Sequence, residues 1–162
     1  MATTMVNTDQ DVIVSEIEIA APPERVFQAL TDAGQLSRWF SGPECPAKSW
    51  EMDPRPGGRY GYATQKGSLV VNGVSEFECH GEIVEYYPPR LLSYTWIANW
   101  HDDTSRPTLV RWELTPQGGT RHSATHVKVT HSGLAQEPVA RKDYSGGWPG
   151  IVAMLKKFVE QK

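Results

Sequence analysis

The fold of this chain is decided by residues 145–160, whose sequence is SGGWPGIVAMLKKFVE. On a helical period, one side of this stretch is apolar and carries Trp148, Ile151, Val152, Leu155, Phe158 and Val159. Two lysines and Glu160 fall on the opposite side. A helix with so wide an apolar face needs a large surface to lie on. Because almost everything before it has the pattern of β-strands, the predicted partner is a sheet.

The residues before this helix predict a series of antiparallel strands. Residues 11–20 alternate, with Ile13, Ile17 and Ile19 on one face, as expected of a half-buried strand. Gly81 predicts a bulge or a bend in a long later strand. The connections are short, so most neighbouring strands must run antiparallel. The later strands are predicted over residues 47–52, 59–65, 66–73 (the end of a hairpin), 74–87, 90–98, 107–115 and 120–131.

Two short helices are predicted between the first strand and the second. Pro22 and Pro23 stop the strand and can open a helix, because the first helical turn does not use the missing N–H. Asp32 is the expected N-cap of the second helix. Near the other end of the chain, Pro149 and the glycines before it leave two alternatives. Either one helix is kinked near Ser145, which is the preferred interpretation, or two segments abut there.

Length and composition indicate one domain, over residues 11–162, after a disordered leader over residues 1–10. The formal net charge is −3 with no block of Lys and Arg, so no nucleic-acid partner is expected. No apolar run is long enough for a membrane helix, and the N-terminus lacks the features of a signal peptide. Cys45 and Cys79 do not make a disulfide framework, so a cytoplasmic location is expected.

Several motifs carry a resemblance to a known family. They are APPERVFQALTD at 21–32, LSRWF at 36–40, PGGRY at 56–60, GEIVEYYPPRLLSYTW at 81–96, THSGL at 130–134 and GW at 147–148. In this order they resemble the family named for activators of the heat-shock-protein-90 ATPase, which belongs to the START-like or helix-grip superfamily. The resemblance implies an α+β fold. In it, a curved antiparallel sheet of six to seven strands wraps around a long C-terminal helix, with two short helices between strands one and two.

The same resemblance leaves three functions open. The first is a protein that binds a small hydrophobic or amphipathic molecule in a cavity between sheet and helix. The second is a module that interacts with a chaperone or another protein, as a co-chaperone does. The third is a cyclase or hydrolase acting on an aromatic or polyketide-like substrate, although no catalytic residue is assigned and an enzyme is not the preferred interpretation. Helix-grip proteins of this family are often dimers, so a homodimer is also left open.

Aromatic residues give the candidate lining of such a cavity. The chain has 6 Trp, 6 Tyr and 4 Phe. Buried indole N–H and phenol O–H groups need hydrogen-bond partners, so an aromatic lining suits an amphipathic ligand. The alternative is that these rings fill a solid core. The predicted lining comprises Trp39, Phe40, Trp50, Tyr60, Tyr62, Phe77, Trp96, Trp112 and Trp148.

Polar residues give weaker signals. The five histidines lack the spacing of a zinc site, so neither a metal nor a cofactor is expected. Glu76, Glu78 and Glu82 share one face of a strand, which is typical of the wet side of a sheet. Burial of Glu78 or His126 in the cavity would favour an enzyme, since a buried acid or base has a shifted pKa. An exposed apolar patch over a filled interior would favour the protein-interaction module.

Overall fold

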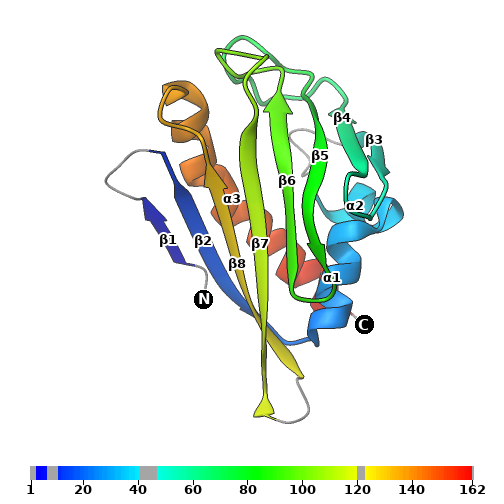
Figure 1. Ribbon diagram of the computed structural model, residues 1–162. Coiled ribbons are helices and arrows are strands. Elements are labelled where there is room, and N and C mark those ends of the chain that lie inside the picture. Colours follow the sequence, from blue (N-terminus) through cyan, green and yellow to red (C-terminus); the bar gives the residue numbers. More distant parts are fainter. Residues whose placement is uncertain (1–2, 7–10, 41–46, 120–122, 162) are drawn as a thin grey trace.

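A computed structural model describes residues 3–6, 11–40, 47–119 and 123–161 of the protein. A curved sheet forms one layer, and a long C-terminal helix lies across its inner face (Figure 1). The two short helices sit at one end of that layer. The elements are β1 (Thr3–Val6), β2 (Ile13–Ile19), α1 (Pro23–Thr31), α2 (Ala33–Trp39), β3 (Ala47–Met52), β4 (Arg59–Thr64), β5 (Glu78–Tyr87), β6 (Leu91–Ala98), β7 (Thr108–Gln117), β8 (Ala124–Ser132) and α3 (Pro138–Glu160).

The strands follow the order β1-β2-β8-β7-β6-β5-β4-β3, and every neighbouring pair is antiparallel. Strands β2 to β8 form the predicted sheet, so the α+β helix-grip architecture is confirmed. The pairing of β2 with β8 brings the start of the domain beside its last strand, with Ile13 opposite His131 and Ile19 opposite Thr125. From β3 to β8 the strands pair in sequence order, as the short connections predicted.

Two local expectations need correction. The disordered leader is wrong at Thr3–Val6, which forms β1 against β2; the rest of residues 1–10 lies outside the described residues. The open edge of β2 offers unpaired backbone groups, and β1 satisfies them. Residues 66–73 form no named strand. Instead, Val71 and Val74 make a single bridge around Asn72 (φ 51°) and Gly73 (φ 80°), which is the geometry of a tight hairpin turn.

The short helices begin as predicted. Pro23 occupies the first turn of α1, and Val26, Phe27 and Leu30 are buried. Asp32 caps α2, because its Oδ1 accepts the backbone N–H groups of Gly34 at 2.8 Å and Gln35 at 3.4 Å. This cap fixes the direction of α2.

The C-terminal run forms one helix, α3, from Pro138 to Glu160, with Pro149 inside it. The alternative of two abutting segments is therefore wrong. Ser145 caps no second segment, since its hydroxyl donates to the carbonyl of Lys142 at 2.7 Å. The predicted apolar stripe is buried against the sheet through Trp148, Val152, Leu155 and Val159, whereas Ala153 is exposed.

Gly81 in β5 has a different role from the one predicted. The register shift between β5 and β6 falls between Ile83 and Glu85, beyond this glycine. A Cβ at Gly81 would lie 1.8 Å from the carbonyl oxygen of Thr95 and 2.8 Å from the ring of Tyr60. Glycine is therefore required by close approach of the backbone and not by a bulge.

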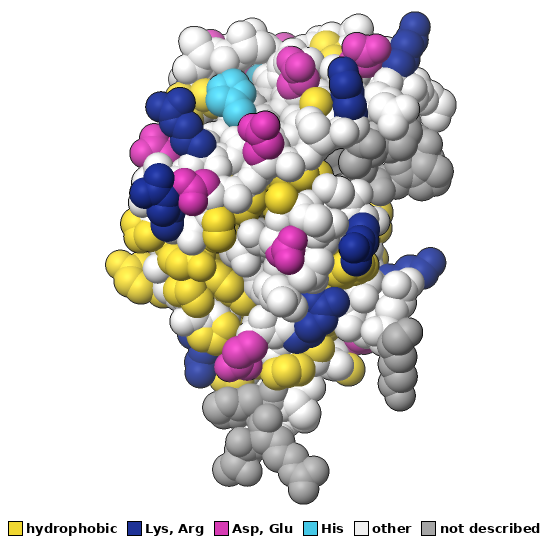
Figure 2. All heavy atoms as spheres, turned by 90° about the vertical axis from the view of Figure 1, so that its right-hand side faces the viewer, with side chains coloured by type: hydrophobic (Ala, Val, Ile, Leu, Met, Phe, Trp, Pro, Cys, Tyr) yellow, Lys and Arg dark blue, Asp and Glu magenta, His cyan; other side chains and the backbone are white. Residues whose placement is uncertain are grey.

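On the face turned to the viewer in Figure 2, Lys and Arg side chains alternate with Asp and Glu, and hydrophobic side chains show between them. Four large hydrophobic side chains are exposed among the described residues: Val70, Val84, Tyr87 and Val139. None of the helices in the described ranges is long and apolar enough to cross a membrane.

Candidate functional site

A pocket of about 400 Å³ lies between the inner face of the sheet and the middle of α3. This volume is within the range of small-molecule sites. One wall comes from the sheet, one from α3, and the rest from the end of α2, the hairpin between β4 and β5, and the loop after β6. The lining residues are Phe40, Tyr62, Thr64, Leu69, Val71, Phe77, Trp96, Trp100, Asp143, Tyr144, Gly146, Gly147, Trp148, Gly150, Ile151 and Met154.

The nine predicted aromatic residues divide into two groups. Five of them lie on the pocket: Phe40, Tyr62, Phe77, Trp96 and Trp148. The other four (Trp39, Trp50, Tyr60 and Trp112) are buried in the walls behind it.

Three of those four donate a hydrogen bond inside the wall. The indole of Trp39 donates to the carbonyl of Ala29 at 2.8 Å, the phenol of Tyr60 to that of Thr95 at 2.7 Å, and the indole of Trp112 to the hydroxyl of Tyr94 at 2.9 Å. Trp50 stacks on Tyr62, with ring centroids 4.7 Å apart. These rings support the pocket but do not line it.

Trp96 is the centre of the aromatic wall. Its ring centroid lies 5.9 Å from that of Tyr62, 6.0 Å from Trp148 and 6.2 Å from Phe40. Trp100 meets Phe77 edge-on at 5.1 Å on the opposite side. Because each ring is held by others, the wall is preorganised and needs little reordering to receive a ligand.

The pocket face of α3 is unusual for a helix. Asp143, Gly147, Gly150 and Met154 are spaced so that they lie on one side, with Gly146 beside them. Within the described part of the chain, a Cβ built at any of these three glycines meets no atom closer than 4 Å. Glycine in a helix costs about 1 kcal/mol relative to alanine, and close packing does not require it here. The three glycines leave open space where side chains would otherwise stand.

A buried polar chain runs beneath the pocket. The hydroxyl oxygen of Tyr144 accepts the indole N–H of Trp96 at 2.9 Å and lies 2.8 Å from Nε2 of His101. Burial raises the pKa of Tyr144 well above 10, so this side chain remains a neutral phenol. Burial also lowers the pKa of His101, despite the opposing charges of Glu137 and Asp102.

His131 continues this chain in a defined state. The indole N–H of Trp148 donates to its Nδ1 at 3.0 Å, so the network assigns the ring proton to Nε2. Nε2 then donates to Thr108 Oγ1 at 2.7 Å, and the Thr108 hydroxyl donates to the carbonyl of Trp96 at 2.8 Å. Burial lowers the pKa of His131 well below 6.5, which is consistent with a neutral imidazole. The chain therefore holds Trp96 and Trp148 in place.

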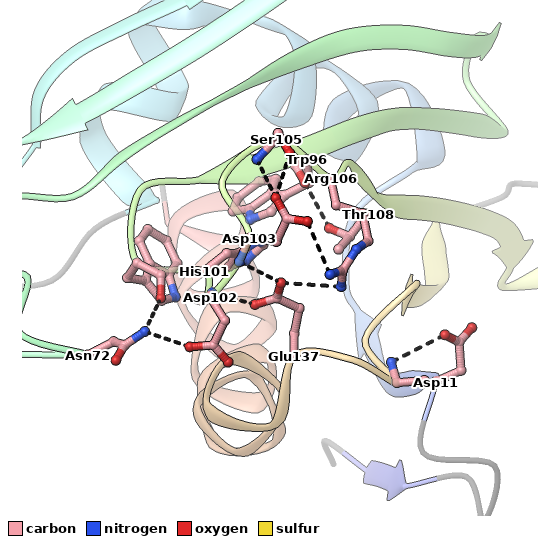
Figure 3. Close-up of polar contacts among 12 residues, drawn as sticks. Asp11, Asn72, Trp96, His101, Asp102, Asp103, Ser105, Arg106, Thr108 and Glu137 are labelled. Atoms are coloured by element: carbon pink, nitrogen blue, oxygen red, sulfur yellow. Dashed lines mark hydrogen bonds and ion pairs between the residues drawn. The ribbon is translucent and has the colours of Figure 1, made fainter.

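The loop that carries Trp100 is tied down at both ends (Figure 3). At the start of α3, the buried carboxylate of Glu137 accepts the backbone N–H groups of Asp102 at 2.7 Å and Asp103 at 3.0 Å. Arg106 lies 3.4 Å from the same carboxylate. On the other side, the amide of Asn72 donates to the Trp100 carbonyl at 3.0 Å. These contacts connect the hairpin, the loop and α3, which together frame the pocket.

Among the described residues, Asp143 is the one charged side chain on the pocket lining. It is half-buried, and burial raises the pKa of its carboxyl group. Among the described residues it has neither a hydrogen bond nor an ion pair. Trp100 adds an indole N–H that is buried without a hydrogen-bond partner in the described structure. The pocket thus has a carboxyl group in a mainly apolar lining, and the Trp100 indole N–H lies buried in its wall.

The residues proposed as markers of an enzyme lie elsewhere. Glu78 is exposed, as are Glu76 and Glu82, so that face of β5 is the wet side of the sheet. His126 bonds Glu16 at 2.8 Å and Glu18 at 2.6 Å across the β2–β8 pair, away from the pocket lining. Across the described ranges, no three His, Cys, Asp or Glu side chains come together as a metal site. Cys79 is a buried free thiol, and Cys45 lies outside the described residues.

Sequence reasoning missed Trp100, Tyr144 and Asp143. Trp100 lies in a stretch with the composition of a polar loop, so no periodicity placed it inside. The helical spacing from Asp143 to Met154 was readable, but it carries glycine where an apolar stripe was sought. Only the folded structure shows that residues at this spacing line a pocket.

Comparisons with known proteins agree with this fold. A protein of Mesorhizobium loti, MLL2253, is 25% identical, with a TM-score of 0.69 over 92% of this chain and 96% of that one. CV1439 from Chromobacterium violaceum is 21% identical, with a TM-score of 0.76 over 94% and 99%. CalU16 from Micromonospora echinospora is 20% identical, with a TM-score of 0.62 over 99% and 84%. Among curated proteins, no sequence matches this chain.

The match to a sequence family covers most of the domain. Residues 20–160 match the family described as "Activator of Hsp90 ATPase homolog 1-like protein". The matched range contains both short helices, β3 to β8 and α3, and therefore every residue that lines the pocket. This chain belongs to the family of Activator of Hsp90 ATPase homolog 1-like proteins.

Proposed function

We propose that this protein binds a small hydrophobic or amphipathic molecule in the pocket between the sheet and α3. The observation that carries the proposal is the glycine face of α3. Gly146, Gly147 and Gly150 weaken the helix, and no neighbouring atom is close enough to exclude a side chain at these positions. The benefit of these glycines therefore lies in the space that they leave. That space adjoins an aromatic wall held by internal hydrogen bonds.

The lining supports an amphipathic ligand more than a purely apolar one. Its rings and aliphatic side chains provide contact with an apolar body. The Asp143 carboxylate can orient a polar end, since it lacks a hydrogen-bond partner in the described structure. The partial burial of this carboxylate makes an unmatched ligand costly and a matched one specific.

The other two functions have less support. The exposed large hydrophobic side chains among the described residues number four: Val70 in the hairpin, Val84 and Tyr87 in β5, and Val139 at the start of α3. For an enzyme, the described lining of the pocket offers Asp143 without a second carboxylate or a histidine. Tyr144 is held as a neutral phenol and is no base. Binding without turnover is the simpler proposal.

The test is a thermal-shift screen of apolar and amphipathic compounds, with native mass spectrometry of protein purified from its own host. Gly147→Leu places a side chain in the pocket and should abolish the shifts that wild-type protein shows. Ala153→Leu adds the same side chain on the exposed side of α3 and should preserve them. Gly147→Ala should raise the stability of the free protein by about 0.5–1 kcal/mol, because alanine favours the helix and meets no clash.

Two results would count against the proposal. The first is a wild-type protein that no compound stabilises and that carries no ligand from its host. The second is equal loss of ligand shifts in Gly147→Leu and Ala153→Leu, which would place the binding site elsewhere. A fall in stability for Gly147→Ala would show that glycine is kept for packing.

A further inference from the structure

We propose that the ligand of this pocket is a cationic amphiphile, in which an apolar body carries an ammonium group that lies beside Asp143. The inference rests on the proposed binding function and names the chemical class of the ligand. Three features of the lining lead to it: its charge, its rings and the position of its carboxylate.

The charge of the lining has one sign. Of the sixteen lining residues that the structure describes, Asp143 is the single carboxylate, and none is Lys, Arg or His. An anionic ligand would meet an unpaired carboxylate in a poorly hydrated space, which is repulsive. A cation would instead give that carboxylate the partner that it lacks among the described residues.

The rings of the lining also favour a cation. The aromatic residues of the lining are Phe40, Tyr62, Phe77, Trp96, Trp100, Tyr144 and Trp148. An aromatic ring attracts a cation over its face through its quadrupole, and cages of such rings are used to recognise ammonium groups. Tryptophan is the most effective of these rings, and three of the seven are tryptophans.

The position of Asp143 places the two features together. It precedes Tyr144 in α3, and the Tyr144 ring lies 6.0 Å from Trp100 and 6.4 Å from Trp148. One turn further along α3, Gly146 and Gly147 line the same pocket and carry no side chain. In this arrangement the ammonium group lies at the Asp143 end of the lining, and the apolar body of the ligand extends toward Gly150 and Met154.

The test compares three probes that share one ring system and differ in their polar group: 2-naphthylmethylamine, 2-naphthylmethanol and 2-naphthoic acid. Isothermal titration calorimetry at pH 7.5 and low salt should give the amine at least a tenfold tighter Kd than the alcohol, with the acid weakest. In Asp143→Asn, the amine should fall to within about threefold of the alcohol, and the alcohol should be unchanged. Glu24→Gln removes the same charge from exposed α1 and should change none of the three.

The outcomes separate the two proposals. If the alcohol binds but the amine binds no tighter, or if Asp143→Asn weakens both alike, the ligand class is wrong while a binding pocket remains. If none of the three probes binds wild-type protein, this inference is overturned, and the screen described above then decides the binding function alone. Selective loss of the amine in Asp143→Asn, with unaltered binding in Glu24→Gln, would establish the carboxylate as the site of cation recognition.

Discussion

Acidification should destabilise this protein through His131. His131 is fully buried and its Nδ1 accepts the indole N–H of Trp148, so a proton there would break that bond. Burial lowers its pKa in the folded state well below 6.5. Between the folded and unfolded pKa values, the imidazole of His131 is therefore protonated in the unfolded chain and neutral in the folded protein. The stability contributed by the neutral ring is fully present above pH 6.5 and is lost as the pH falls below it.

The size of this loss follows from linkage. Each unit of pH below the unfolded pKa costs about 1.4 kcal/mol for one such group, so a fall from pH 7.5 to pH 5.0 costs about 2 kcal/mol through His131. The lowered pKa of His101 adds to the loss in the same direction. His126 acts in the opposite direction, because its bonds to Glu16 and Glu18 raise its pKa, and its contribution disappears as the pH rises.

The assay is urea unfolding followed by tryptophan fluorescence at several pH values between 5.0 and 7.5. His131→Asn keeps an acceptor for Trp148 but does not titrate. Relative to the wild type, its free energy of unfolding should therefore improve by about 2 kcal/mol on going from pH 7.5 to pH 5.0. His126→Gln serves as the control of opposite sign. Identical pH dependence of the wild type and His131→Asn would refute the neutral state assigned to His131.

Two further predictions concern the walls of the pocket. Trp96→Ala should lower the free energy of unfolding in urea by about 3–5 kcal/mol and remove ligand-induced thermal shifts. Glu16→Ala, on the outer face of the sheet, should preserve these shifts. Equal effects of the two variants on the shifts would exclude Trp96 from the site. Glu137→Ala should cost about 3 kcal/mol, because it leaves the backbone N–H groups of Asp102 and Asp103 without an acceptor and leaves Arg106 with Asp103 as its ion-pair partner. Glu137→Gln retains an acceptor and should cost clearly less, and equal losses would mean that the carboxylate contributes only through packing.

Local patterns were sufficient to predict most of the fold. The 3.6-residue stripe from Trp148 to Val159 depends only on the spacing of apolar residues, and it is the buried face of α3. The cap at Asp32 is equally local, since its acceptor and its donors are two or three residues apart. The strand at Thr3–Val6 escaped prediction because it is too short to show a period and exists by pairing with β2.

The pocket was only partly predictable, and β4 shows why. Tyr60 and Tyr62 point to the same face of this strand, so alternation treats them alike. In three dimensions Tyr62 reaches the pocket, whereas Tyr60 is covered by Tyr94, whose ring lies 4.6 Å away. Strand periodicity predicts the face of the sheet on which a side chain lies. It does not predict whether that side chain reaches the pocket or is covered by its neighbours.

The sequence by itself determined the order of the elements, the apolar face of α3 and the aromatic character of the interior, because each depends on residue type and short-range spacing. The tertiary structure alone decided that Trp100 and Tyr144 join the pocket, that His131 is neutral, and that Asp143 faces an apolar space without a partner among the described residues. Those properties arise from burial and from contacts between residues far apart in the chain. The same holds for the glycines of α3, which lower helix stability and which only the folded structure places on the lining of the pocket.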